Sequence, residues 1–178
     1  MRESDDWPTV NLFVRRDLFL QVGGFDNGYW PGEDTRFCLA LAEAGHRVLY
    51  DPDLVVWHHR RPLFAPHLKQ VGAYGLHRGH FARKFPRTSR RLGYLAPTAF
   101  LLFVLLGWLP ALWLPSLAAV WGSILAIYAL GSLLDAWRVA RTAPLTRMVW
   151  LGIAVTHLWY GLRFLQGFFT PNLKSRLR

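Results

Sequence analysis

Hydrophobic residues follow two different patterns along the chain. Up to residue 92, short apolar runs alternate with turns rich in glycine, proline and aspartate, whereas Gly93 to Leu134 is a run of 42 residues without a charge. One membrane-crossing helix needs about 20 apolar residues, so this run is long enough for two. We therefore predict an α/β part over residues 1–91 and an all-α transmembrane region of two to three helices over residues 92–178.

The apolar half divides into three candidate spans. Two prolines interrupt the uncharged run near its middle, and proline is a poor residue for a helix interior. The first two spans are therefore predicted at about residues 93–112 and 116–134, and a third apolar stretch covers residues 148–169. Because this stretch contains His157 and Arg163, and a charge at the centre of a span costs about 2.5–3.5 kcal/mol, it either spans or lies in the membrane interface.

Within the polar half, apolar and β-branched runs predict short strands, and amphipathic runs between turn residues predict helices. One helix opens with Glu33 and Asp34, acids that the helix dipole favours on a first turn, and Gly45 is expected to end it. The other predicted elements are strands at residues 10–14, 46–50 and 54–57 and helices at residues 16–22 and 65–83.

Composition and charge exclude several classes of protein. A hydrophobic content of 52% excludes a disordered chain, and the single cysteine, Cys38, excludes a disulfide scaffold and is expected in the core. The net charge is +10, but no nucleic-acid-binding motif accompanies it, so membrane lipids rather than nucleic acid are the expected partner. Basic residues before the first span favour a cytoplasmic position for the polar half. These residues are Arg78, Arg83, Lys84, Arg87, Arg90 and Arg91.

Basic residues also follow the third apolar stretch, namely Lys174, Arg176 and Arg178. Three full spans would place them on the side opposite the other basic clusters. An interfacial or re-entrant third segment would keep them on the same side.

Five motifs in the polar half follow one another in a recognisable order, at residues 11–19, 22–26, 32–35, 45–52 and 55–58. In this order and spacing, residues 9–91 resemble the acceptor-side, C-terminal half of the GT-A catalytic domain of family 2 glycosyltransferases. The resemblance implies an inverting, hexosyltransferase-type enzyme that moves a sugar from a nucleotide-sugar donor to a lipid-linked or polysaccharide acceptor in cell-surface glycan synthesis. It also implies a multi-pass protein of the inner (plasma) membrane with its catalytic part in the cytoplasm.

The resemblance assigns roles to three residues. Asp34 would be the general base, with Glu33 beside it, although either acid could simply cap the helix. His58 would complete the coordination of a divalent metal, Mg²⁺ or Mn²⁺, or would simply end a surface strand.

Four further residues are candidates for contacts with the acceptor or donor. Tyr29 and Trp30 could stack on a sugar ring or could fill the core. Gln70 and Arg78 could contact substrate or could face solvent. Processive members carry Gln-x-x-Arg-Trp near this place, and Ala73 and Tyr74 depart from that motif, which argues against a processive synthase.

The family's nucleotide-binding half, with its metal-binding Asp-x-Asp motif, is not found before Asn11. The sequence is therefore expected to be a fragment that is inactive by itself and that binds metal only together with that half. Two alternatives remain open. The chain could assemble with a separately encoded nucleotide-binding half, or it could be a non-enzymatic membrane protein whose basic juxtamembrane domain docks anionic lipid or a partner subunit.

Overall fold

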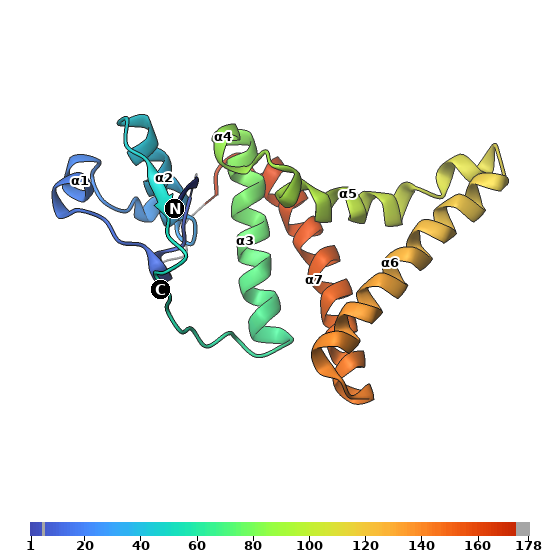
Figure 1. The fold of residues 1–178 in the computed structure, drawn as a ribbon. Coiled ribbons are helices and arrows are strands. Elements are labelled where there is room, and N and C mark those ends of the chain that lie inside the picture. Colours follow the sequence, from blue (N-terminus) through green and yellow to red (C-terminus); the bar gives the residue numbers. More distant parts are fainter. Residues whose placement is uncertain (5, 174–178) are drawn as a thin grey trace.

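The computed structural model describes residues 1–4 and 6–173, so the basic tail residues lie outside the described residues. A small, irregular module lies at one end of the molecule and long helices form the other end (Figure 1). The strands are β1 (Arg2–Ser4) and β2 (Val48–Tyr50), and the 3-10 turns are η1 (Thr9–Asn11), η2 (Asn27–Tyr29) and η3 (Leu109–Leu112). The helices are α1 (Arg16–Gln21), α2 (Glu33–Glu43), α3 (Ala65–Lys84), α4 (Pro86–Ser89), α5 (Leu92–Leu106), α6 (Ser116–Ala140) and α7 (Ala143–Phe169).

The sheet of the module is smaller than the sequence predicts. β2 confirms the strand predicted near residues 46–50, and it pairs antiparallel with β1, whose polar sequence gives no strand signal. The strands predicted at residues 10–14 and 54–57 are wrong, because both segments are irregular apart from η1. They lie side by side, but the side-chain nitrogen of Asn11 donates to the Leu54 carbonyl oxygen at 2.8 Å where a strand ladder was expected. The α/β expectation therefore reduces to a mostly helical chain with a two-stranded sheet.

Helix α2 forms the core of the module. Its buried side chains include Phe37, Cys38 and Leu41, and the Phe37 ring packs on the rings of Phe19 and Phe25. The predicted cap is confirmed, because Gly45 has a φ of +84° and its amide donates to the Ala42 carbonyl oxygen at 3.1 Å. The next amide, of His46, donates back to Leu41 at 2.9 Å, which completes a Schellman motif.

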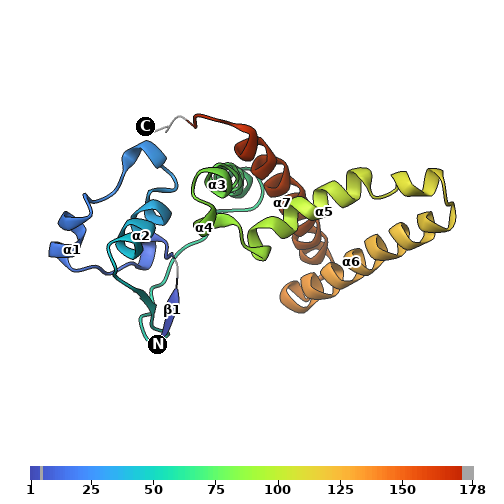
Figure 2. The ribbon, with the colours of Figure 1, turned by 90° about the horizontal axis from the view of Figure 1, so that it is seen from above.

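Helix α3, predicted at residues 65–83, joins the module to the membrane helices. It runs side by side with the C-terminal half of α7 (Figures 1 and 2). Glycines allow this close contact: a Cβ atom on Gly79 would overlap the Phe164 carbonyl oxygen, and one on Gly75 would lie 2.8 Å from the Tyr160 carbonyl oxygen. The two backbones therefore touch with no side chain between them.

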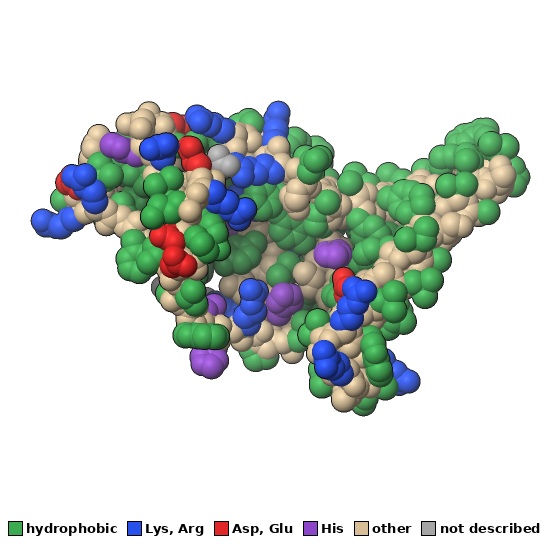
Figure 3. All heavy atoms as spheres, viewed as in Figure 1, with side chains coloured by type: hydrophobic (Ala, Val, Ile, Leu, Met, Phe, Trp, Pro, Cys, Tyr) green, Lys and Arg blue, Asp and Glu red, His purple; other side chains and the backbone are tan. Residues whose placement is uncertain are grey.

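Helices α5 and α6 form a hairpin that opens from the η3 turn, and α7 lies across the open end of the hairpin (Figures 1 and 2). Residues Leu92–Leu112, Ser116–Ala140 and Ala143–Phe169 are each long and apolar enough to cross a membrane. All three predicted apolar stretches are therefore helical, and the third is longer than predicted. The end of the hairpin shows hydrophobic side chains and no charged ones on the face seen in Figure 3.

Candidate active site

A cleft of about 540 Å³ lies where the module meets α3, α5 and α7. One wall comes from the start of α2 and from the segment that follows β1. The opposite wall comes from α3 and from the membrane helices. Its lining includes Asp6, Asp34, Arg78, Tyr94, Pro97 and Tyr160. The cleft therefore joins ionisable groups of the module to aromatic side chains of the membrane part.

Asp34 lies on the first turn of α2, and its side chain is partly buried in the cleft wall. Its Oδ1 atom accepts a hydrogen bond from the Thr35 amide at 2.7 Å. Burial raises the pKa of the Asp34 carboxyl above its ordinary value, although the amides of Thr35 and Thr9 oppose the shift. Burial also raises the pKa of the neighbouring Glu33, and the Asp34 charge adds to that effect. Both acids therefore hold a proton more tightly than acids in water.

A charged network fixes the wall that contains Asp34. Arg78 of α3 donates to Asp6 Oδ2 at 2.6 Å, and the Thr35 hydroxyl donates to the same oxygen at 3.1 Å. The guanidinium of Arg78 also lies 4.2 Å from the centre of the Tyr94 ring. Burial by itself would lower the pKa of Arg78, but the Asp6 carboxylate raises it, so Arg78 stays charged. One arginine thus ties α3 to the N-terminal segment, to α2 and to α5.

The remaining candidates from the sequence lie at different distances from this cleft. Gln70 lies one turn before the cleft on α3, where its amide donates to the hydroxyl of Tyr74, a lining residue. The Tyr29 ring packs edge-on against the rings of Phe81 and Phe85, and Trp30 is 40% exposed. Of the sequence candidates, the structure therefore brings Asp34 and Arg78 together, with Gln70 next to them.

His58 lies apart from the other candidates. It is exposed on the irregular segment between β2 and α3. Within residues 1–4 and 6–173, no group of three or more His, Cys, Asp or Glu side chains could hold a metal ion. The described residues do not by themselves fit the divalent metal that the family resemblance implies.

The sequence patterns did not reveal three of the cleft residues. Asp6, Tyr94 and Tyr160 come from distant parts of the chain, and each has an ordinary local context. Tyr160 lies in an apolar helix, yet its hydroxyl is buried without a partner among the described residues. A tyrosine of this kind can be recognised only once α7 is known to border the cleft.

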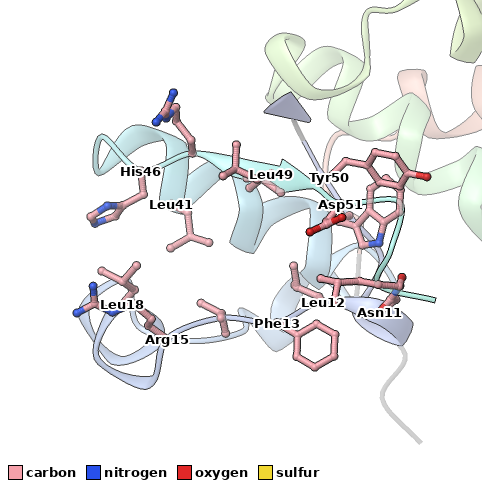
Figure 4. Close-up of a pocket in the computed structure, with 15 residues that line it drawn as sticks. Asn11, Leu12, Phe13, Arg15, Leu18, Leu41, His46, Leu49, Tyr50 and Asp51 are labelled. Atoms are coloured by element: carbon pink, nitrogen blue, oxygen red, sulfur yellow. The ribbon is translucent and has the colours of Figure 1, made fainter. Parts of the chain in front are cut away.

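A second pocket, of about 280 Å³, lies on the other side of the module (Figure 4). Leu18 of α1 and Leu41 of α2 face each other across it, and Leu12 and Leu49 also line it. In the described part of the chain, the side-chain oxygen of Asn11 and Nε2 of His46 are buried there without a hydrogen-bond partner. Besides its apolar side chains, this pocket is lined by Arg15, His46, Arg47 and Asp51.

Comparison with known proteins identifies the family. The model of the family described as "Glycosyl transferase family group 2" matches residues 5–162. The chain belongs to this family. The family resemblance of the five motifs is thereby confirmed.

Curated relatives match shorter segments of the chain. The pre-mycofactocin glycosyltransferase of Mycobacterium tuberculosis is 34% identical over 68 residues, which are 38% of this chain and 14% of the relative. Glycosyltransferase AglE of Haloferax volcanii is 37% identical over 54 residues, which are 30% of this chain and 18% of the relative. The matches thus span less than a fifth of the length of either relative. No solved structure matches the chain.

Proposed function

We propose that this chain is the acceptor-side part of an inverting, membrane-bound glycosyltransferase and that Asp34 is its general base. Residues 1–91 would belong to the catalytic domain and residues 92–178 to the membrane part. The position of Asp34 carries the proposal, because this residue lies on the first turn of α2 and lines a cleft large enough for a sugar unit.

In the proposed reaction, Asp34 removes the proton from an acceptor hydroxyl as that oxygen attacks the anomeric carbon of the donor sugar. The new bond forms on the face opposite the leaving group, so the configuration of that carbon inverts. The bond from the anomeric carbon to the diphosphate breaks, and the nucleoside diphosphate leaves with the electron pair. A carboxyl whose pKa is raised by burial suits this role, because a general base works best with a pKa near the operating pH.

The acceptor would lie between Asp34 and the aromatic wall formed by Tyr94 and Tyr160. Aromatic rings bind the apolar face of a sugar, and Gln70 and Arg78 lie close enough to the cleft to hold its polar groups. Because α5 and α7 form part of this wall, the cleft favours an acceptor held at a membrane, either lipid-linked or a growing glycan. Tyr29 and Trp30 would support the loop that precedes the base. The reaction would take place at the cytoplasmic face of the cell membrane.

The nucleotide-sugar donor and a divalent metal would be held mainly by a nucleotide-binding part that is not among these residues. The matches cover 14% and 18% of the relatives, which supports this division. His58 could reach such a metal only as a single ligand contributed to that other part.

The test is a transfer assay on the chain joined to the nucleotide-binding half of a family member. The joined protein, in proteoliposomes, is given a panel of labelled nucleotide sugars and bacterial membrane lipids, and labelled glycolipid is measured. Transfer is expected, and Asp34→Asn should lower its rate by roughly 10²–10⁴-fold, the usual contribution of a general base. The chain alone should transfer no sugar.

Asp17→Asn is the matched control, because Asp17 is an exposed acid that also lies on the first turn of a helix. It should leave the rate unchanged. Wild-type transfer by the Asp34→Asn protein would refute the role of Asp34. Transfer by the chain alone would refute the division into two parts.

A further inference from the structure

We infer that Asp6 is a positioning residue for the general base, Asp34. Its carboxylate holds the Arg78 guanidinium and the Thr35 hydroxyl, which leaves Asp34 without an ionic partner and free to take a proton from the acceptor. This inference rests on the proposed function of Asp34. It gives a role to a residue that no sequence motif singles out.

The first observation is that Asp6 joins two elements that border the base. Its Oδ2 atom accepts a hydrogen bond from Arg78 of α3 at 2.6 Å and another from the Thr35 hydroxyl of α2 at 3.1 Å. Thr35 is 4% exposed and directly follows Asp34, and its amide donates to Asp34 Oδ1 at 2.7 Å. Asp6 therefore fixes the residue whose amide holds the base.

The second observation is that the contacts of Arg78 lie away from the base. Its guanidinium donates to Asp6, donates to the Thr88 carbonyl oxygen at 3.5 Å and lies 4.2 Å from the centre of the Tyr94 ring. The side chains of Arg78 and Asp6 are 20% and 17% exposed, so water screens this pair only partly. Within residues 1–4 and 6–173, Asp34 forms no ion pair.

This pairing matters for the chemistry, because a cation bound to the base would weaken it. A nearby positive charge stabilises the charged form of a carboxylate and so makes it a poorer proton acceptor. The charge of Arg78 lowers the pKa of Asp34, and the charge of Asp6 raises it. Without the Asp6 charge, the effect of Arg78 on the base would be unopposed.

The other ionisable groups around Asp34 supply no second cation. Burial raises the pKa of Cys38 to about 11 and lowers the pKa of His77, so both are neutral at pH 7. Glu33 is a neighbouring acid whose pKa burial also raises. The remaining ionisable side chains that line the cleft are Tyr74, Tyr94 and Tyr160. Among the described residues that line the cleft, Arg78 is therefore the only permanent cation.

Titration of the aspartates in the 178-residue chain tests the inference without requiring sugar transfer. The chain is labelled with ¹³C at the aspartate carboxyl carbons and purified in detergent micelles. Carboxyl chemical shifts are then followed by NMR as the pH is raised. The signal of Asp34 is identified as the one that is lost in Asp34→Asn.

Asp6→Asn should lower the titration midpoint of Asp34, because the charge of Arg78 then acts on it alone. Asp6→Asn combined with Arg78→Gln removes both charges and should return the midpoint toward that of wild type. Asp17→Asn is the matched control, since it removes an exposed acid that is also paired with an arginine, and it should leave the midpoint unchanged.

An unchanged or raised midpoint in Asp6→Asn would overturn the inference, and so would a double variant whose midpoint stays as low as that of the single variant. If Asp6→Asn fails to fold, Arg78→Gln alone gives the opposite test. It should raise the midpoint of Asp34, because only the Asp6 charge then acts on it, and a fall or no change would contradict the inference.

The joined protein shows the effect of Asp6 on transfer. Asp6→Asn should move the acid limb of the pH profile of kcat/KM to lower pH, and its loss of rate at neutral pH should be smaller than the roughly 10²–10⁴-fold loss of Asp34→Asn. Asp6→Glu keeps the charge and should restore the position of the limb.

The failure of each proposal has its own signature. If transfer does not depend on Asp34, the proposed function fails, whatever the titration shows. If transfer depends on Asp34 but Asp6→Asn leaves the acid limb in place, only the positioning role of Asp6 fails.

Discussion

The module and the hairpin both expose large apolar side chains, but their backbones differ. Val55 of the module is 68% exposed, and Ile127 of α6 is 70% exposed. The backbone around Ile127 is hydrogen-bonded within α6. The Val55 amide donates to the Asp53 carbonyl oxygen at 3.1 Å in a turn, and residues 56–61 after it make no backbone–backbone hydrogen bond within the described part of the chain. Lipid accepts only surfaces whose backbone groups are already paired. Similar exposed fractions of apolar side chains therefore indicate different environments: lipid is the expected neighbour of α6, and protein is the expected neighbour of the module.

The second pocket also indicates that a protein neighbour covers this part of the module. Asn11 and His46 each bury a polar atom there that has no partner among the described residues. Buried polar atoms without partners are costly, so native proteins rarely keep them. Both atoms are closed off from solvent, so a neighbouring polypeptide could pair with them only if the pocket rearranged on binding. The nucleotide-binding part of the proposed transferase would be such a polypeptide.

The largest effect is expected when the same charge is placed in each region. Ile127→Arg puts an arginine near the middle of α6 and should cost about 2.5–3.5 kcal/mol of insertion free energy. Val55→Arg should have no effect on insertion, because that segment does not meet lipid. The measurement is the fraction of protein that stays in carbonate-washed membranes. Equal losses for both variants would remove the distinction between the two surfaces.

The next largest effect concerns the contact between α3 and α7. Gly79→Ala adds a methyl group where the Phe164 carbonyl leaves no room, and it should destabilise the protein by about 1–3 kcal/mol. Gly131→Ala is the control, because a Cβ atom on that α6 glycine meets nothing within 4 Å. Heat-induced aggregation in detergent measures both. A Gly79→Ala protein as stable as wild type would show that the helices can separate freely.

A smaller effect is expected from the charged network of the cleft. Asp6→Asn removes the carboxylate that pairs with Arg78, in a site where both side chains are about 20% exposed or less. The expected loss is about 2 kcal/mol, because one largely buried charge then lacks its partner. Asp135→Asn breaks an exposed pair with Arg138 and should change stability by less than about 0.5 kcal/mol. Denaturant titration of the detergent-solubilised protein measures both losses, and similar values would contradict this ranking.

The smallest effect is a pH dependence of stability at Asp34. Because burial raises its pKa in the folded state, folding favours the protonated form, and that stabilisation is lost as the pH rises through the raised pKa. Asp34→Asn should therefore melt above wild type at neutral pH, and the two should converge near the ordinary pKa of 3.8. The variant would thus be more stable while being inactive.

Asp17→Asn provides a control of opposite sign. A hydrogen bond from Arg15 lowers the pKa of Asp17, so its contribution is present at neutral pH and is lost as the pH falls. Its removal should slightly lower the melting temperature at neutral pH. If both variants shifted in the same direction, burial would not be the cause of the Asp34 effect.

The sequence predicted those elements whose signals are local. Gly45 and the acids at residues 33 and 34 define α2 from either end, and the long apolar runs define α5, α6 and α7. The strands at residues 10–14 and 54–57 failed for a physical reason, because a strand also needs a partner. The sequence gives the apolar side chains of a strand, but it does not say whether another strand lies beside it.

The cleft was predictable only in part for a similar reason. Asp34 and Arg78 could be proposed from the motifs around them. Asp6 and Tyr160 lie more than 150 positions apart in the chain, and they line the same cleft because α3 packs on α7. That packing depends on glycines in α3 and α7. The spacing of the glycines in one of these helices does not reveal that the other helix packs against it.

The glycine contact between α3 and α7 has a consequence for motion. Glycine has no side-chain torsions, so this contact forms without a loss of side-chain rotamer entropy. For the same reason, a change of rotamer at these glycines cannot weaken it. Helices α3 and α7 are then held as one body, and the wall of the cleft that they line keeps its shape. An acceptor would meet a preorganised wall and would spend little of its binding energy on ordering it.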